Sequence, residues 1–124
     1  MTRILAIAVA GALGALARYG FAGLVQRWAG ARFPVGTLAV NVAGCFLIGL
    51  LATYSLERWS ISPTARTALL VGFLGAFTTF STFSYETLAL LREGALWRAG
   101  LNVGLSLLLC LAATWAGVML AVRT

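Results

Sequence analysis

The sequence predicts an all-α integral membrane protein with four transmembrane helices. Hydrophobic residues make up 61% of the 124 positions, and charged residues make up only 10%. A soluble domain carries about 25% charged residues, so this chain has too few charges to cover a surface that faces water. The charges divide the sequence into four long apolar stretches, and about 20 apolar residues cross a bilayer as a helix. Helices are favoured over strands because a helix bonds its backbone groups within one segment.

The expected spans cover residues 4–26, 33–56, 67–91 and 99–122, within one transmembrane domain of residues 1–124. Arginines, glutamates and prolines occupy the segments between them. Trp28, Trp59 and Trp97 lie at span ends, as in an interfacial aromatic belt. An alternative interpretation of the first stretch is a cleaved signal peptide, which would leave three spans.

The composition also excludes several classes of function. The chain has no Lys, Asp or His, so a His-based catalytic triad and a His-rich metal site are both absent, and we expect no enzyme. The net charge of +6 comes from arginines spread along the chain. That distribution indicates contact with anionic lipid headgroups rather than with nucleic acid. Cys45 and Cys110 fall inside spans, where we expect buried thiols rather than a disulfide.

The arginines do not favour either orientation in the membrane. Four of them fall on the side of the N-terminus, second loop and C-terminus, and four fall in the first and third loops. Orientation is normally set by an excess of Lys and Arg on one side. The balance predicts insertion in both orientations, with antiparallel pairing of identical subunits. The alternative is that one or two arginines dominate and the balance is accidental.

The third expected span contains an unusual polar run around its midpoint, residue 79. Glycine and threonine are poor helix formers, and the run holds Gly75, Thr78, Thr79, Ser81 and Thr82. We therefore expect a broken helix near the midplane, with freed backbone groups that face protein or a cavity. The alternative is an unbroken helix whose hydroxyls bond to their own carbonyls.

Uncharged donors and aromatic rings in three of the spans predict a path for a small anion. Phe80 and Phe83 are three residues apart and share a helix face, and their ring edges are positive. Asn41 lies in the second span, and Asn102 and Ser106 share a face of the fourth. Neutral donors can replace part of an anion's hydration shell without trapping it. The alternative role for these polar residues is to hold helices together.

Two charges lie inside spans, and intramembrane charges are functional candidates. Arg18 is in the first span and Glu86 is in the third. We expect Arg18 to attract anions into a vestibule and Glu86 to accept a hydrogen bond at the end of the pore. Structural pairing is the alternative for both.

Three segments, in chain order, resemble the CrcB/Fluc family of fluoride channels. They are residues 11–19 (GALGALARY), 36–44 (GTLAVNVAG) and 72–86 (GFLGAFTTFSTFSYE). The third is highly specific, and the resemblance covers nearly the whole chain.

The resemblance implies a multi-pass protein of the bacterial inner membrane that exports fluoride passively and so gives fluoride resistance. It implies an antiparallel dual-topology homodimer with two pores. The implied pore residues are Asn41, Phe80, Phe83, Ser81, Thr82 and Ser106, with Asn102 where the family often has tyrosine. It also implies a central structural Na⁺ held by the backbone carbonyls of Gly75 and Thr78 from both subunits.

Two other functions fit a chain of this size. A small multidrug-type dual-topology exporter is similar in size, but that class resembles a coupled antiporter with a glutamate in its first helix. The first span here has Arg18 and no carboxylate. A non-transporting assembly subunit held together by glycines would leave the polar run of the third span unexplained.

Overall fold

The computed structural model describes residues 1–30 and 32–124, and within these residues it contains helices and no strands. The elements are α1 (Thr2–Ala29), α2 (Val35–Glu57), α3 (Pro63–Thr67), the π-helical η1 (Ala68–Leu74), α4 (Gly75–Phe77), α5 (Phe80–Arg92) and α6 (Leu96–Arg123). Four stretches of the described chain are long and apolar enough to cross a membrane: Thr2–Ala29, Val35–Glu57, Pro63–Arg92 and Leu96–Arg123. The prediction of an all-α protein with four candidate spans is confirmed.

The first two helices differ from the predicted spans at their ends. Helix α1 continues through Arg27 and Trp28 and stops at Gly30, whose φ of 56° is the left-handed conformation that glycine adopts readily at a helix end. Helix α2 begins two residues later than predicted because Pro34 occupies its N-cap. The lack of charged residues therefore predicted where these helices lie, whereas Gly30 and Pro34 determine the residues at which they end or begin.

The third and fourth crossing segments begin earlier than predicted. The third starts at Pro63, whose fixed φ suits the first turn of a helix. The hydroxyl of Ser62 accepts a hydrogen bond from the amide of Ala65 at 3.1 Å and caps this end. Helix α6 starts at Leu96 rather than at residue 99. Arg66 and Arg98, expected in the second and third loops, are thus inside helices.

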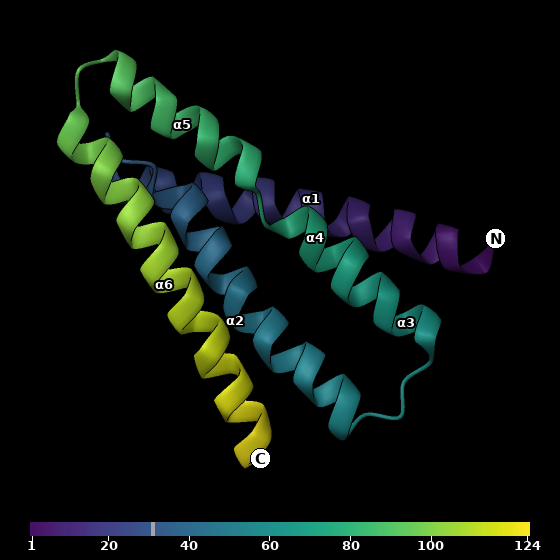
Figure 1. The fold of residues 1–124 in the computed structure, drawn as a ribbon. Coiled ribbons are helices and arrows are strands. Elements are labelled where there is room, and N and C mark those ends of the chain that lie inside the picture. The colour runs from purple at the N-terminus through teal and green to yellow at the C-terminus, as the bar shows by residue number, and fades with distance from the viewer. Residues whose placement is uncertain (31) are drawn as a thin grey trace.

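Helices α2 and α6 lie side by side and run in the same direction (Figure 1). Their contact is very close at Gly49, because a Cβ built there would collide with the carbonyl oxygen of Thr114 on α6. A Cβ on Gly117 would likewise collide with the carbonyl oxygen of Phe46. Small residues let helix backbones approach in a membrane, where dispersion contacts replace the hydrophobic effect between helices.

Helix α1 packs against the first half of the third crossing segment, and Figure 1 shows the two side by side. A Cβ on Gly14 would overlap the carbonyl of Phe73 in η1. The stretch η1 is π-helical over seven residues, a form that is rare and is frequently found at functional sites. It leads directly into the three residues of α4.

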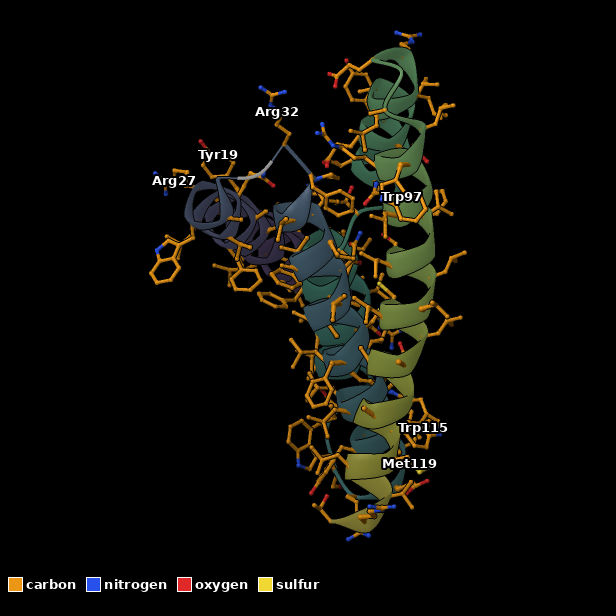
Figure 2. The ribbon with its side chains drawn as sticks, turned by 90° about the vertical axis from the view of Figure 1, so that its left-hand side faces the viewer. Tyr19, Arg27, Arg32, Trp97, Trp115 and Met119 are labelled. Carbon is orange, nitrogen blue, oxygen red and sulfur yellow. The ribbon has the colours of Figure 1, made fainter. Side chains whose placement is uncertain are left out.

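Many large apolar side chains point away from the molecule, as suits a lipid solvent. Trp28, Trp59 and Trp97 are exposed near helix ends, and Trp115 is exposed within α6. Figure 2 shows Trp97 and Trp115 at different heights along α6, and labels Tyr19, Arg27 and Arg32 in the upper left of the view. The fully buried positions are few and lie where helices cross, as at Val40, Leu74 and Asn102.

Candidate functional site

The third crossing segment is interrupted at Thr78 and Thr79. Helix α4 ends at Phe77, and α5 begins at Phe80. Thr78 has φ −90° and ψ 159°, and Thr79 has φ −151° and ψ 116°, so both are extended. Two β-branched residues in sequence favour this conformation over the helix. The structure thus contains the helix break that the polar run predicts.

The side chain of Asn41 on α2 holds the break in place. Its Oδ1 accepts a hydrogen bond from the amide of Thr79 at 2.8 Å, and its Nδ2 donates to the carbonyl of Thr79 at 3.0 Å. One amide group therefore satisfies both backbone groups of an extended residue that is almost fully buried. Asn41 keeps its second N–H for another acceptor, since a side-chain amide has two donors.

The hydroxyl of Thr79 caps the start of α5. Its Oγ1 accepts from the amide of Thr82 at 3.2 Å, donates to the Thr82 hydroxyl at 3.0 Å and lies 3.4 Å from the Ser81 hydroxyl. Thr79 thereby joins Ser81 and Thr82 into one cluster of hydroxyls. From the sequence, Thr79 was expected only to weaken the helix at the span midpoint, although a threonine directly before a helix start is a common capping signal.

The break also diverts two backbone amides from their helical partners. In a continuous helix, the amides of Thr79 and Thr82 would donate to the carbonyls of Gly75 and Thr78. Here the Thr79 amide donates to Asn41, and the Thr82 amide donates to the Thr79 hydroxyl. The carbonyls of Gly75 and Thr78 therefore lose these two amides as partners, and both residues line one cavity.

This first cavity has a volume of about 390 Å³ and lies between α2, the broken segment and α6. Four of the predicted pore residues line it, namely Asn41, Phe80, Phe83 and Ser106. The rings of Phe80 and Phe83 are tilted by 54° with centroids 5.4 Å apart. Phe80 is 76% exposed, so the cavity is open on the side where this ring projects.

A second cavity, of about 560 Å³, lies between α1, α2 and α5. Arg18, Thr82 and Glu86 line it, together with Thr37. The hydroxyl of Thr37 donates a hydrogen bond to the Glu86 carboxylate. Thr79 lines both cavities, so the buried capping threonine separates the charged cavity from the one with the phenylalanines.

Asn102 and Ser106 share a face of α6 but have different surroundings. Ser106 lines the first cavity, whereas Asn102 is buried to 2% exposure and is absent from the lining of both. Its Nδ2 donates to the hydroxyl of Thr87 at 2.8 Å, and that hydroxyl donates to the carbonyl of Phe83 at 2.8 Å. In the structure, Asn102 therefore forms a hydrogen bond that joins α6 to α5.

Ser81 is exposed beside the break and lines neither cavity. Two further polar residues take part in the local structure without having been singled out by their sequence context. Thr37 bonds Glu86, and Gln26 joins α1 to the start of α2. The Gln26 amide donates to the carbonyl of Phe33 at 3.1 Å and accepts from the amide of Gly36 at 2.9 Å. Their partners are far along the chain or across a loop, so no local pattern marks them.

Comparison with known proteins identifies the family. The family model described as "CrcB-like protein, Camphor Resistance (CrcB)" matches residues 5–118. A protein of Geobacter sulfurreducens named fluoride-specific ion channel FluC is 58% identical over 98% of each chain. A protein of the same name from Methylococcus capsulatus is 54% identical over 97% of this chain and 53% of its own length. Another from Geotalea daltonii is 50% identical over 98% of each chain. A match over almost all of the four crossing segments shows that this chain belongs to the CrcB family.

Proposed function

We propose that the protein is a fluoride-selective ion channel that lets cytoplasmic fluoride leave the cell passively and so gives fluoride resistance. The observation that carries the proposal is the identity of 50–58%, along nearly the whole chain, with proteins named fluoride-specific ion channels. The protein is accordingly a multi-pass membrane channel and not an enzyme. The bacterial inner membrane is its proposed location.

The first cavity supplies the chemistry that a fluoride path needs. Fluoride is compact and strongly hydrated, so a path must offer several donors at short range. The hydroxyl of Ser106 and the remaining N–H of Asn41 provide uncharged donors at this cavity. The tilted rings of Phe80 and Phe83 provide positive edges. Such contacts bind an anion less tightly than a positively charged side chain in the path would.

The second cavity is proposed as the vestibule. The Arg18 guanidinium raises the local concentration of anions at its wall. Glu86 is bonded by Thr37, which occupies one carboxylate oxygen. Ser81 and Thr82 continue the hydroxyl cluster from Thr79 along the start of α5. This cluster forms the proposed polar track between vestibule and ring pair.

An antiparallel homodimer is proposed as the working assembly. The first cavity combines polar groups with an opening beside an exposed phenylalanine. Polar groups facing lipid are unfavourable, so a second copy is the natural cover. Equal numbers of arginines on the two sides support opposite orientations for the two copies. Two equivalent paths follow from the twofold symmetry.

The same arrangement fits a structural Na⁺ at the centre of the dimer. The Gly75 and Thr78 carbonyls lack their helical partners, and two copies would present four carbonyl oxygens. Hard cations prefer oxygen ligands. The ion would supply positive charge that fixes the two breaks against each other.

Passive export follows from the chemistry of hydrogen fluoride. The uncharged acid crosses a bilayer and dissociates in a near-neutral cytoplasm. The trapped anion then leaves through the channel, driven by the inside-negative potential, which is worth about 2.3 kcal/mol per charge at 100 mV. The multidrug-exporter alternative has no support, because the relatives are fluoride channels and α1 carries no carboxylate.

The proposal is tested by fluoride efflux from proteoliposomes, measured with a fluoride electrode. Wild-type protein is expected to release trapped fluoride, and Phe80→Ile is expected to slow release because the ring edge is lost while the protein still folds. Phe21→Ile is the matched control, since Phe21 is a phenylalanine of α1 that lines neither cavity. Equal rates for wild type and Phe80→Ile would contradict the assignment of the ring pair.

A further inference from the structure

The two cysteines of the chain lie opposite each other on α2 and α6. Cys45 is one turn before Gly49 on α2, and Cys110 is one turn before Thr114 on α6. The two helices run in the same direction (Figure 1), and Gly49 and Thr114 face each other at the close helix contact. One turn back along both helices, Cys45 therefore faces Cys110.

The two thiols lie near each other and remain unlinked. Their side chains are close enough to interact electrostatically, and both residues are free cysteines of intermediate exposure. Both also line the first cavity, beside Phe80, Phe83 and Ser106. The proposed fluoride path uses neither thiol. The cavity gives a small molecule room to reach the pair.

The pair has the features of a site for a soft cation with two ligands. Thiolate sulfur selects soft metal ions. Among the described residues, no group of three His, Cys, Asp or Glu side chains lies close enough to hold a metal, so a four-coordinate Zn²⁺ site is not complete here. A cation that bonds linearly to two sulfurs needs no third ligand, and Hg²⁺ is such a cation.

Net charge selects among the soft cations. A monovalent ion such as Ag⁺ or Cu⁺ with two thiolates would leave one permanent negative charge among mostly apolar side chains, and such an unpaired charge is unfavourable. A divalent ion with two thiolates is neutral. We infer that Cys45 and Cys110 form a two-coordinate site for a thiophilic divalent cation, with Hg²⁺ as the probe.

The binding step balances without an oxidant or a reductant. Each thiol loses its proton to water, and each sulfur forms one bond to mercury. Mercuric chloride gives up its two chloride ions as the two S–Hg bonds form. The neutral mercuric chloride molecule can also cross the lipid to reach a site between helices.

Occupation of the site is expected to block the channel, a consequence that rests on the proposed function. The metal would bridge α2 and α6 at the wall of the cavity that holds the ring pair and Ser106. A bulky ion between the two sulfurs narrows this cavity.

Binding is measured first, on purified protein in detergent, with an intact-mass measurement after addition of mercuric chloride and a challenge with glutathione. Wild type is expected to retain one Hg²⁺ per chain. Cys45→Ser and Cys110→Ser each keep one thiol. They are expected to lose Hg²⁺ at glutathione concentrations about 100-fold lower than wild type does, because in wild type the first thiol bound to mercury raises the effective concentration of the second. Cys45→Ala and Cys110→Ala repeat the test without a new hydroxyl. Two Hg²⁺ per wild-type chain, or equal retention by the single-thiol variants, would overturn the site.

Channel block is measured second, by fluoride efflux from proteoliposomes. Mercuric chloride is expected to lower wild-type efflux to the rate of protein-free liposomes, and dithiothreitol is expected to restore it. The double variant Cys45→Ser/Cys110→Ser should be unaffected. Unchanged efflux from mercury-loaded wild type would overturn the block. Absence of fluoride efflux before mercury is added would overturn the proposed function instead, and the mass measurement would still decide the site.

Discussion

Replacing Asn41 tests whether the helix break depends on one side-chain amide. Asn41→Asp keeps an oxygen that accepts from the Thr79 amide but removes the Nδ2 that donates to the Thr79 carbonyl at 3.0 Å. That carbonyl then lies buried against a second oxygen, at a cost of about 1–3 kcal/mol. The new carboxylate also repels an anion, by about 4 kcal/mol at a separation of about 4 Å and an effective dielectric constant of about 20.

Together these terms predict a fluoride efflux rate at least about ten-fold below wild type, since about 1.4 kcal/mol corresponds to a factor of ten. Asn41→Leu separates the two effects, because it removes both hydrogen bonds and adds no charge. Asn41→Leu should also slow efflux. Asn102→Leu is the control variant, because it removes the same side-chain amide at a buried position outside both cavities.

The assay uses liposomes loaded with potassium fluoride, with valinomycin to carry potassium and a fluoride electrode to follow release. Size-exclusion chromatography before reconstitution checks that each variant is folded. Wild-type efflux from well-folded Asn41→Leu would refute the claim that this amide holds the break in its conducting form. If Asn41→Asp slowed efflux and Asn41→Leu did not, the slower efflux would be due to the negative charge of the aspartate.

The remaining predictions concern packing, the α5–α6 link and sodium. Gly44→Ala places a methyl group on the Thr78 side chain and should lower the free energy of unfolding by about 1–3 kcal/mol. Gly20→Ala, with open space around it, should leave thermal unfolding in detergent unchanged, and equal melting of the two variants would contradict this packing. Asn102→Leu breaks the bond to Thr87 and should lower stability by about 0.6–1.7 kcal/mol. Selectivity for fluoride over chloride should persist in Asn102→Leu. Loss of this selectivity would indicate that Asn102 is a pore residue. Replacement of Na⁺ by a large organic cation should lower the melting temperature of the dimer, and an unchanged temperature would argue against the ion.

The sequence predicted the large-scale fold well because charge distribution alone marks membrane spans. The predicted positions of helix ends were less accurate, as at Gly30 and Pro63, where backbone conformation rather than hydrophobicity determines the end. The break was expected from weak helix formers, and the structure locates it at two threonines. The π-helical stretch η1 was not foreseen, since its residues are ordinary apolar ones.

Roles that depend on distant partners were the hardest to predict. Asn41 was expected as a donor to an anion, and the structure shows its amide bonded on both sides to the backbone of Thr79. Asn102 shares a helix face with Ser106, yet a hydroxyl on α5 takes its hydrogen bond. Spacing along one helix identifies which residues share a face, but only the packing of helices determines what that face contacts.

The most direct test of the account compares fluoride with chloride efflux from proteoliposomes that contain the purified wild-type protein. The uncharged donors and ring edges of the first cavity should pass fluoride, while chloride release stays at the rate of protein-free liposomes. Equal release of the two ions, or release of neither, would contradict the account.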